Sequence, residues 1–199
     1  LLLERRQLVT EALNGWQDVL ELARRKKNDS QLREARAHFI DILHRTYQLR
    51  SRMDGFRMAF EQTPPNWDAG TLLAEGYAKL NLLEQAAAVY RRLLQERPND
   101  VGVLTVLEET YRKQRKIPRA IEMLKALAVA DPTRAKEYFQ RIATLELQRF
   151  NDRVALDYAQ KAVALGPPDA KAYERLGDLF EKQEDFTKAI HAYEKALQL

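Results

Sequence analysis

The sequence contains no cysteine, and that absence removes several classes of function. Without cysteine there is no disulfide framework, no thiolate nucleophile and no cysteine ligand for a metal ion. Only three histidines occur, and His38 and His44 are six residues apart, which does not place two metal ligands on one helix face. Ser30 and Ser51 are the only serines, and no glycine-rich phosphate loop accompanies them. The sequence therefore predicts no enzyme, no metal site and no cofactor.

Glycine and proline are also scarce, with seven of each, and no apolar run approaches the roughly 18 residues that cross a bilayer. Charged residues make up 31% of the chain, and alanine, leucine, glutamate and arginine are frequent, which indicates helices with a solvated surface. The 33 basic residues are interspersed with 29 acidic ones, which is a weak electrostatic footprint for binding a nucleic acid. We expect a soluble, all-α chain, with the cytoplasm favoured, whose partner is neither a nucleic acid nor a membrane.

A repeat of 34 or 35 residues runs through the last two thirds of the chain. Because two residue types keep this spacing independently, each period is interpreted as one helix-turn-helix unit. The units are 67–100, 101–134, 135–169 and 170–199. The residues that mark the period are Ala86, Ala120, Ala155 and Ala189, and Pro98, Pro132 and Pro167.

Within a unit, small residues stand where two helices approach closely, and large ones fill the space between neighbouring helices. In the last unit the small residues include Gly177 and Ala189, and the large ones include Phe180 and Tyr193. Each marker proline follows a second helix, where its missing N–H ends the hydrogen-bond ladder. This pattern resembles the tetratricopeptide repeat family over residues 67–199. The resemblance implies a right-handed α-solenoid of about four repeats that binds protein partners.

The sequence departs from the family's pattern at two notable positions. Glu108 stands where the family has a small residue, and Gly70 stands where it has a large aromatic one. A charged or missing side chain at such positions disturbs close helix packing. We therefore expect looser packing in the second unit, residues 101–134.

Residues 1–66 lack this repeat but carry a heptad stripe. Apolar residues alternate at spacings of three and four from Leu32 through Phe39 to Phe60, and a shorter stripe precedes them. Asn28, Asp29 and Ser30 form a turn with N-cap candidates. The pattern predicts a long helical hairpin of helices about 1–27 and 31–61. A heptad pair can also dimerise, and the sequence leaves both arrangements open.

Four consecutive basic residues, Arg24 to Lys27, end the first of these helices. A basic run can bind a nucleic acid or an anionic lipid. Cations in the last turn of a helix also complement its dipole, and we prefer this interpretation.

In the resembled family, the first helices of the repeats line a concave groove that receives a partner peptide or helix. The residues that line the predicted groove are found at equivalent positions of those first helices, one repeat period apart in the sequence. Its candidate partner-binding residues are Thr71, Glu75, Lys79, Thr105, Glu109, Arg112, Lys113, Gln140, Arg141, Thr144, Lys171, Glu174, Arg175, Asp178 and Lys182.

The predicted groove carries charges of both signs, and two interpretations stay open. The groove orients an extended ligand, or Glu75–Lys79, Glu109–Lys113 and Asp178–Lys182 are ion pairs that stabilise their own helices by about 0.2–0.5 kcal/mol each. These groove positions contain no asparagine, so we expect no carboxylate clamp of the kind that captures chaperone C-termini in the resembled family. Its arginines and lysines favour an acidic partner.

Three functions compete at this point. The leading one is a scaffold or adaptor that binds a protein segment in the groove. The alternative is a regulatory or targeting arm of a larger enzyme or membrane-anchored machine, whose active part lies outside these residues. RNA binding by a helical repeat array needs a stripe of basic and aromatic residues, which the groove positions do not form.

The last predicted helix, about 186–199, carries Ile190, Tyr193 and Leu197 at spacings of three and four. In a repeat array the next repeat covers such a stripe. We therefore expect this stripe to be exposed, and expect either further repeats beyond it or self-association through this helix. The N-terminal hairpin is the other candidate surface for self-association.

The stripe of residues 32–60 contains large side chains that need a packing surface, so we predict that Phe39→Ala lowers the free energy of unfolding by about 3–5 kcal/mol. Chemical denaturation followed by circular dichroism measures this loss. A loss under about 1 kcal/mol would mean that the stripe faces solvent.

Overall fold

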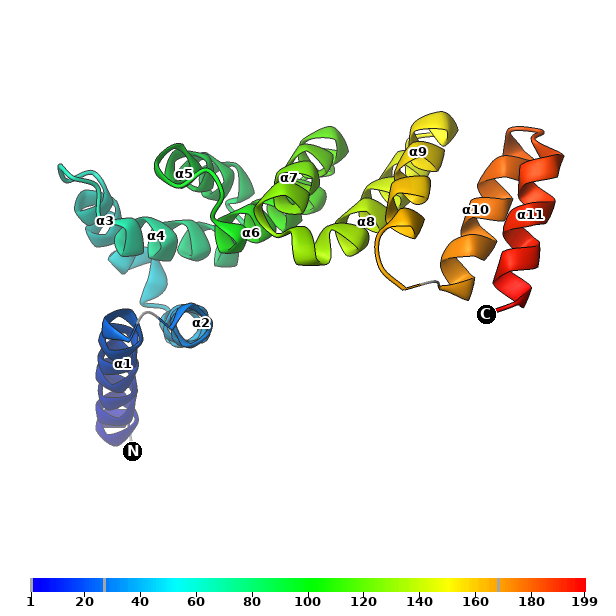
Figure 1. The fold of residues 1–199 in the computed structure, drawn as a ribbon. Helices are drawn as coiled ribbons and strands as arrows, with labels where there is room; N and C mark the ends of the chain where they lie inside the picture. Colours follow the sequence, from blue (N-terminus) through cyan, green and yellow to red (C-terminus); the bar gives the residue numbers. More distant parts are fainter. Residues whose placement is uncertain (1, 27, 168) are drawn as a thin grey trace. The chain divides into compact units, whose positions relative to one another are not determined.

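The computed structural model describes residues 2–26, 28–167 and 169–199, so Leu1, Lys27 and Pro168, including one residue of the predicted basic run, lie outside the described residues. The described residues form eleven α-helices and one short 3₁₀ helix, and no strand (Figure 1). The predicted all-α fold of helical repeats is therefore confirmed. The chain divides into two compact units, Leu1–Glu96 and Arg97–Leu199, which we describe separately.

The first unit contains five helices: α1 (Leu2–Arg25), α2 (Asp29–Arg45), α3 (Leu49–Phe60), α4 (Trp67–Lys79) and α5 (Leu83–Glu96). Two helix pairs dominate it, because α1 packs on α2 and α4 packs on α5. The Asn28 side chain caps α2 by accepting a hydrogen bond from the Gln31 backbone N–H at 3.1 Å. The predicted turn and cap between the first two helices are thus confirmed.

The second unit contains six α-helices in three antiparallel pairs, joined by short loops (Figure 1). A 3₁₀ turn, η1 (Pro132–Arg134), links the first pair to the second. Together with α4 and α5, these pairs are the four predicted helix-turn-helix units. The pairs are α6 (Val101–Lys113) with α7 (Ile117–Ala130), α8 (Ala135–Gln148) with α9 (Asp152–Ala164), and α10 (Ala170–Lys182) with α11 (Phe186–Leu197).

The expectation of one continuous helix over residues 31–61 is wrong, because α2 ends at Arg45 and α3 begins at Leu49. Tyr47 lies between them with a φ of 58°, in the left-handed region that interrupts a helix. The heptad stripe continues across the break, since Phe39, Met53 and Phe60 are all buried. Two shorter helices therefore share the apolar pattern that a single long helix would carry.

In each helix pair of the repeat array, the turn between the two helices carries one residue with positive φ, and the turn between α2 and α3 carries another. This turn geometry repeats with the period of the sequence. The five residues are separated by 34, 34, 35 and 34 positions, and they are Tyr47, Asn81, Arg115, Phe150 and Glu184. The period therefore extends one step upstream of residue 67, into α2 and α3. Helix α3, however, packs mainly on α4 and only slightly on α2, so α2 and α3 do not pack closely against each other as the other pairs do. The boundary predicted after residue 66 stays a prediction.

Gly70 is the position where the family's pattern has a large aromatic residue, and a neighbouring helix supplies the ring instead. A Cβ on Gly70 would lie 2.6 Å from the Phe60 ring of α3 and 2.9 Å from Leu93 of α5. The Arg92 guanidinium stacks over the same ring, 4.6 Å from its centroid. Phe60 is 3% exposed and fills the space beside α4 that the missing side chain leaves.

The stripe that we expected to be exposed on the last helix, α11, is exposed only in part. Ile190 and Leu197 are 58% and 88% exposed, as predicted. Tyr193 instead packs against α10, because a Cβ on Gly177 would lie 2.5 Å from its ring. The spacing of three and four places the three residues on adjacent parts of the helix surface, and Tyr193 lies on the side that faces α10.

Candidate functional site

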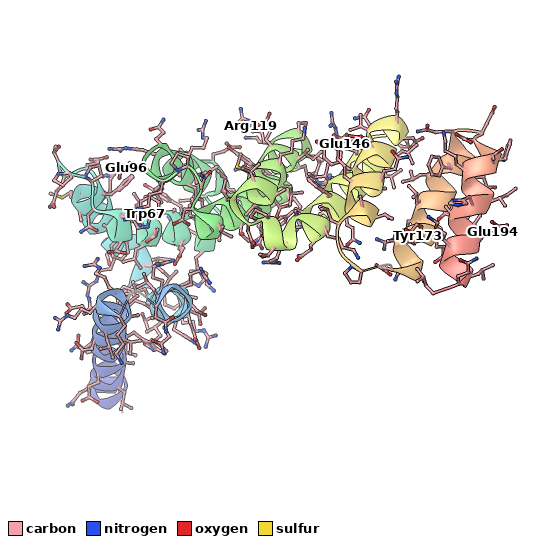
Figure 2. The ribbon with its side chains drawn as sticks, in the orientation of Figure 1. Trp67, Glu96, Arg119, Glu146, Tyr173 and Glu194 are labelled. Carbon is pink, nitrogen blue, oxygen red and sulfur yellow. The ribbon has the colours of Figure 1, made fainter. Side chains whose placement is uncertain are left out.

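The predicted groove residues lie on the first helix of each pair, namely α4 in the first unit and α6, α8 and α10 in the second. Whether these four helices line a single groove stays a prediction, so the two units are taken in turn. Figure 2 draws the side chains along each helix.

In the first unit, the three predicted groove residues of α4 already have partners within the chain. Thr71 is 3% exposed, and its hydroxyl donates to the Asp68 carbonyl at 2.8 Å. Glu75 Oε1 accepts from Arg36 Nε of α2 at 2.9 Å. Lys79 Nζ donates to Asp41 Oδ1 of α2 at 2.7 Å. Glu75 and Lys79 therefore bind α2 rather than each other.

The two carboxylates of these pairs differ in their electrostatic surroundings. Burial raises the pKa of Glu75, and the neighbouring Arg36 only partly opposes that effect. The hydrogen bond from Lys79 lowers the pKa of Asp41, which also pairs with Arg45 at 2.7 Å. Arg24, in the last turn of α1 as predicted, forms a further ion pair with Asp68 of α4. Ion pairs thus fix the N-terminal hairpin to α4.

In the second unit, a buried carboxylate joins two first helices. Glu108 of α6 is 1% exposed, and Arg141 Nη2 of α8 lies 2.5 Å from its Oε2. Arg112 Nε lies 3.1 Å from the other oxygen. The charged residue at a position for a small one is thus accommodated by ion pairs with two arginines that stay partly exposed, and the looser packing expected there stays a prediction. Of the predicted i,i+4 pairs, Glu109–Lys113 is confirmed at 3.0 Å.

Helix α10 is strongly two-sided. Leu176, Leu179 and Phe180 are buried on one side of the helix. The other side exposes charged residues at spacings of three and four, namely Lys171, Glu174, Arg175, Asp178, Glu181 and Lys182. The buried side of α10 packs against its neighbours, and the charged side is exposed.

Asp178 also has an internal partner. The Tyr193 hydroxyl of α11 lies 2.8 Å from Asp178 Oδ1 and 2.9 Å from Glu181 Oε2. Hydrogen bonding to Asp178, together with burial and Glu181, raises the pKa of Tyr193. Sequence reasoning missed this contact because it placed Tyr193 on the exposed side of α11.

The exposed predicted residues of the second unit define a candidate interaction site, which we call the first-helix surface. Gln140 and Arg141 are half-buried at its edge. The first-helix surface consists of Thr105, Glu109, Arg112, Lys113, Thr144, Lys171, Glu174, Arg175, Asp178 and Lys182. Among the residues that the structure describes, no group of three histidine, aspartate or glutamate side chains could hold a metal ion. None of the described helices is long and apolar enough to cross a bilayer.

Two stretches of the chain match the tetratricopeptide repeat. They are residues 68–100, which include α4 and α5, and residues 170–199, which include α10 and α11. The matches cover the first and last of the four predicted units, so the predicted repeat family is confirmed for these two units. A sequence search of curated proteins found no significant match.

Solved structures of MamA are similar in fold. MamA AMB-1 is 20% identical with a TM-score of 0.57, over 79% of this chain and 85% of that one. A second MamA crystal structure is 14% identical with a TM-score of 0.56, over 95% and 92% of the two chains. MamA from Desulfovibrio magneticus RS-1, residue 41 to the end, is 17% identical with a TM-score of 0.53, over 83% and 93%. At these identities the likeness shows the fold alone.

The Asp41–Lys79 pair predicts how stability depends on pH. The pKa of Asp41 is lower in the folded chain than its ordinary 3.8, so its charge stabilises the fold above that value and the effect is lost as the pH falls. We therefore expect Asp41→Asn to lower the thermal unfolding midpoint at pH 7 and to have a smaller effect near about pH 3. As the control, Glu11→Gln neutralises an exposed carboxylate of α1. A difference between Asp41→Asn and wild type that stays constant with pH would contradict the assignment.

Proposed function

We propose that this chain of tetratricopeptide repeats is a non-catalytic scaffold or adaptor that binds a segment of a protein partner on its first-helix surface. The proposal rests on one observation, which is the charged side of α10. There, three basic and three acidic residues are exposed on a helix whose opposite side is buried. Stacked helical repeats present such surfaces to extended or helical peptides.

The charges of the first-helix surface favour a partner segment that is acidic overall. On α6, Arg112 and Lys113 are paired with Glu108 and Glu109, which reduces their attraction for a ligand. On α10, three acidic residues are exposed, and two of them, Asp178 and Glu181, accept from the Tyr193 hydroxyl. Lys171, Arg175 and Lys182 are the groups of α10 that can attract an acidic partner. Complementary charge increases the association rate and selects among partners.

Charge reversal on α10 tests the proposal without breaking an ion pair described above. Captured proteins are compared by quantitative mass spectrometry between the wild-type chain and the Lys171→Glu, Arg175→Glu double variant. We expect the partner to be depleted on the order of tenfold, because two attractive charges become repulsive.

Arg153→Glu serves as the control, since it reverses an exposed charge on α9, a second helix. Circular dichroism establishes that each variant keeps its helices. If the double variant captures the same proteins in the same amounts as the control, the first-helix surface is not the binding site.

A further inference from the structure

A pocket of about 320 Å³ lies in the second unit, bounded by α9, α10 and α11. Its apolar lining includes Val163 of α9, Tyr173, Leu176 and Phe180 of α10, and Ala192 of α11. Tyr173, labelled in Figure 2, belongs to this lining. The pocket is thus built by the second helices α9 and α11 on either side of α10.

The rim of this pocket is basic. Lys188, His191 and Lys195 of α11 all line it, at spacings of three and four, so they share one side of the helix. Lys188 Nζ lies 5.5 Å from the Phe180 ring centroid, and Lys195 Nζ lies 5.6 Å from that of Tyr173. These cation–π contacts hold both ammonium groups beside the apolar lining.

The acidic partner of this rim lies outside the pocket lining. None of the described residues that line the pocket is acidic. Lys188 pairs with Asp185 at 2.6 Å, yet its side chain remains 63% exposed. An apolar pocket with two lysines and a histidine on one side is complementary to a ligand that combines a carboxylate with an apolar group.

We propose that this pocket docks a helical peptide that carries acidic residues beside large apolar ones. The volume lies at the low end of the range of about 300–1,000 Å³ for ligand pockets, so it suits one or two side chains rather than a cofactor. Lys188 and Lys195 are seven residues apart, which is about 10.5 Å along α11. Two carboxylates seven residues apart on a helical peptide match this distance, with the apolar side chains midway between them. The peptide lies between α9 and α11.

This docking site is separate from the first-helix surface, because it is lined by both second helices and by the apolar side chains of α10. It is also separate from the exposed stripe of α11. Ile190 and Leu197 are on the side of α11 opposite Lys188 and Lys195, at the helical rotation of 100° per residue. Binding at the pocket can therefore be tested with variants that do not change the first-helix surface or the exposed stripe of α11.

Fluorescence anisotropy with the full chain and a synthetic helical peptide tests the docking site. The labelled peptide has two glutamates seven residues apart and leucines at the two positions midway between them. We expect it to bind, and we expect the His191→Glu, Lys195→Glu double variant to bind on the order of tenfold more weakly. The neutral variant His191→Gln, Lys195→Gln should fall between the two.

Two matched comparisons distinguish this site from apolar attraction alone and from the first-helix surface. A peptide with lysine in place of both glutamates should not bind, and the Lys171→Glu, Arg175→Glu variant should bind the acidic peptide as the wild type does. The proposal is overturned if the wild type fails to bind the acidic peptide, or if folded variants of His191 and Lys195 bind it unchanged. It is also overturned if only the Lys171 and Arg175 variant loses binding.

Discussion

Close approach between a small residue and a large side chain holds the helices of this chain together. A Cβ on Gly70 or Gly76 of α4 would lie within 2.6 or 2.7 Å of Phe60 or Met53 of α3. In the last pair, a Cβ on Gly177 would lie 2.5 Å from the Tyr193 ring. Cβ atoms do not tolerate such distances, so the missing side chain lets the helices pack. The side of each helix that is packed in this way also decides which side remains exposed.

That constraint organises the charged residues. Because α10 places Gly177, Leu176 and Phe180 toward its neighbours, Lys171 and Arg175 are left on the outside. Elsewhere charges pair between helices instead, as Arg36 of α2 does with Glu75 of α4 and Arg141 of α8 does with Glu108 of α6. Charged residues of the first helices thus form internal ion pairs at some positions and are exposed at others.

Much of the fold could be predicted from the sequence, because the repeat is marked by residue type. The alanine and proline spacings located all four helix pairs, and the heptad stripe identified many of the buried side chains of α2 and α3, although not Ile40 and Leu43. The break at Tyr47 was missed, since its positive φ occurs at a tyrosine rather than at a glycine and the apolar spacing continues through it. The sequence did contain a signal that the repeat extends upstream to this break, because Pro64 precedes Pro98 by one repeat period.

The candidate site was harder to predict than the fold. Stepping the period located the first-helix positions, but it could not show that Glu75 and Lys79 bind Arg36 and Asp41, because residues 38 or 39 positions apart meet only through tertiary packing. Tyr193 was misplaced for a similar reason. Spacing gives the direction of a side chain around its own helix, and the position of the neighbouring helix decides whether that direction is buried.

The effect of Gly177→Ala on the free energy of unfolding, measured in two backgrounds, tests the importance of this close packing most directly. In the wild type, the new methyl group meets the Tyr193 ring, and we expect a loss of about 1–3 kcal/mol. In a Tyr193→Ala background the space is open, and alanine should stabilise the helix by roughly 0.8–1 kcal/mol relative to glycine. We therefore predict that the substitution changes sign between the backgrounds. An equal effect in both would show that the contact between Gly177 and Tyr193 does not determine how α10 and α11 pack.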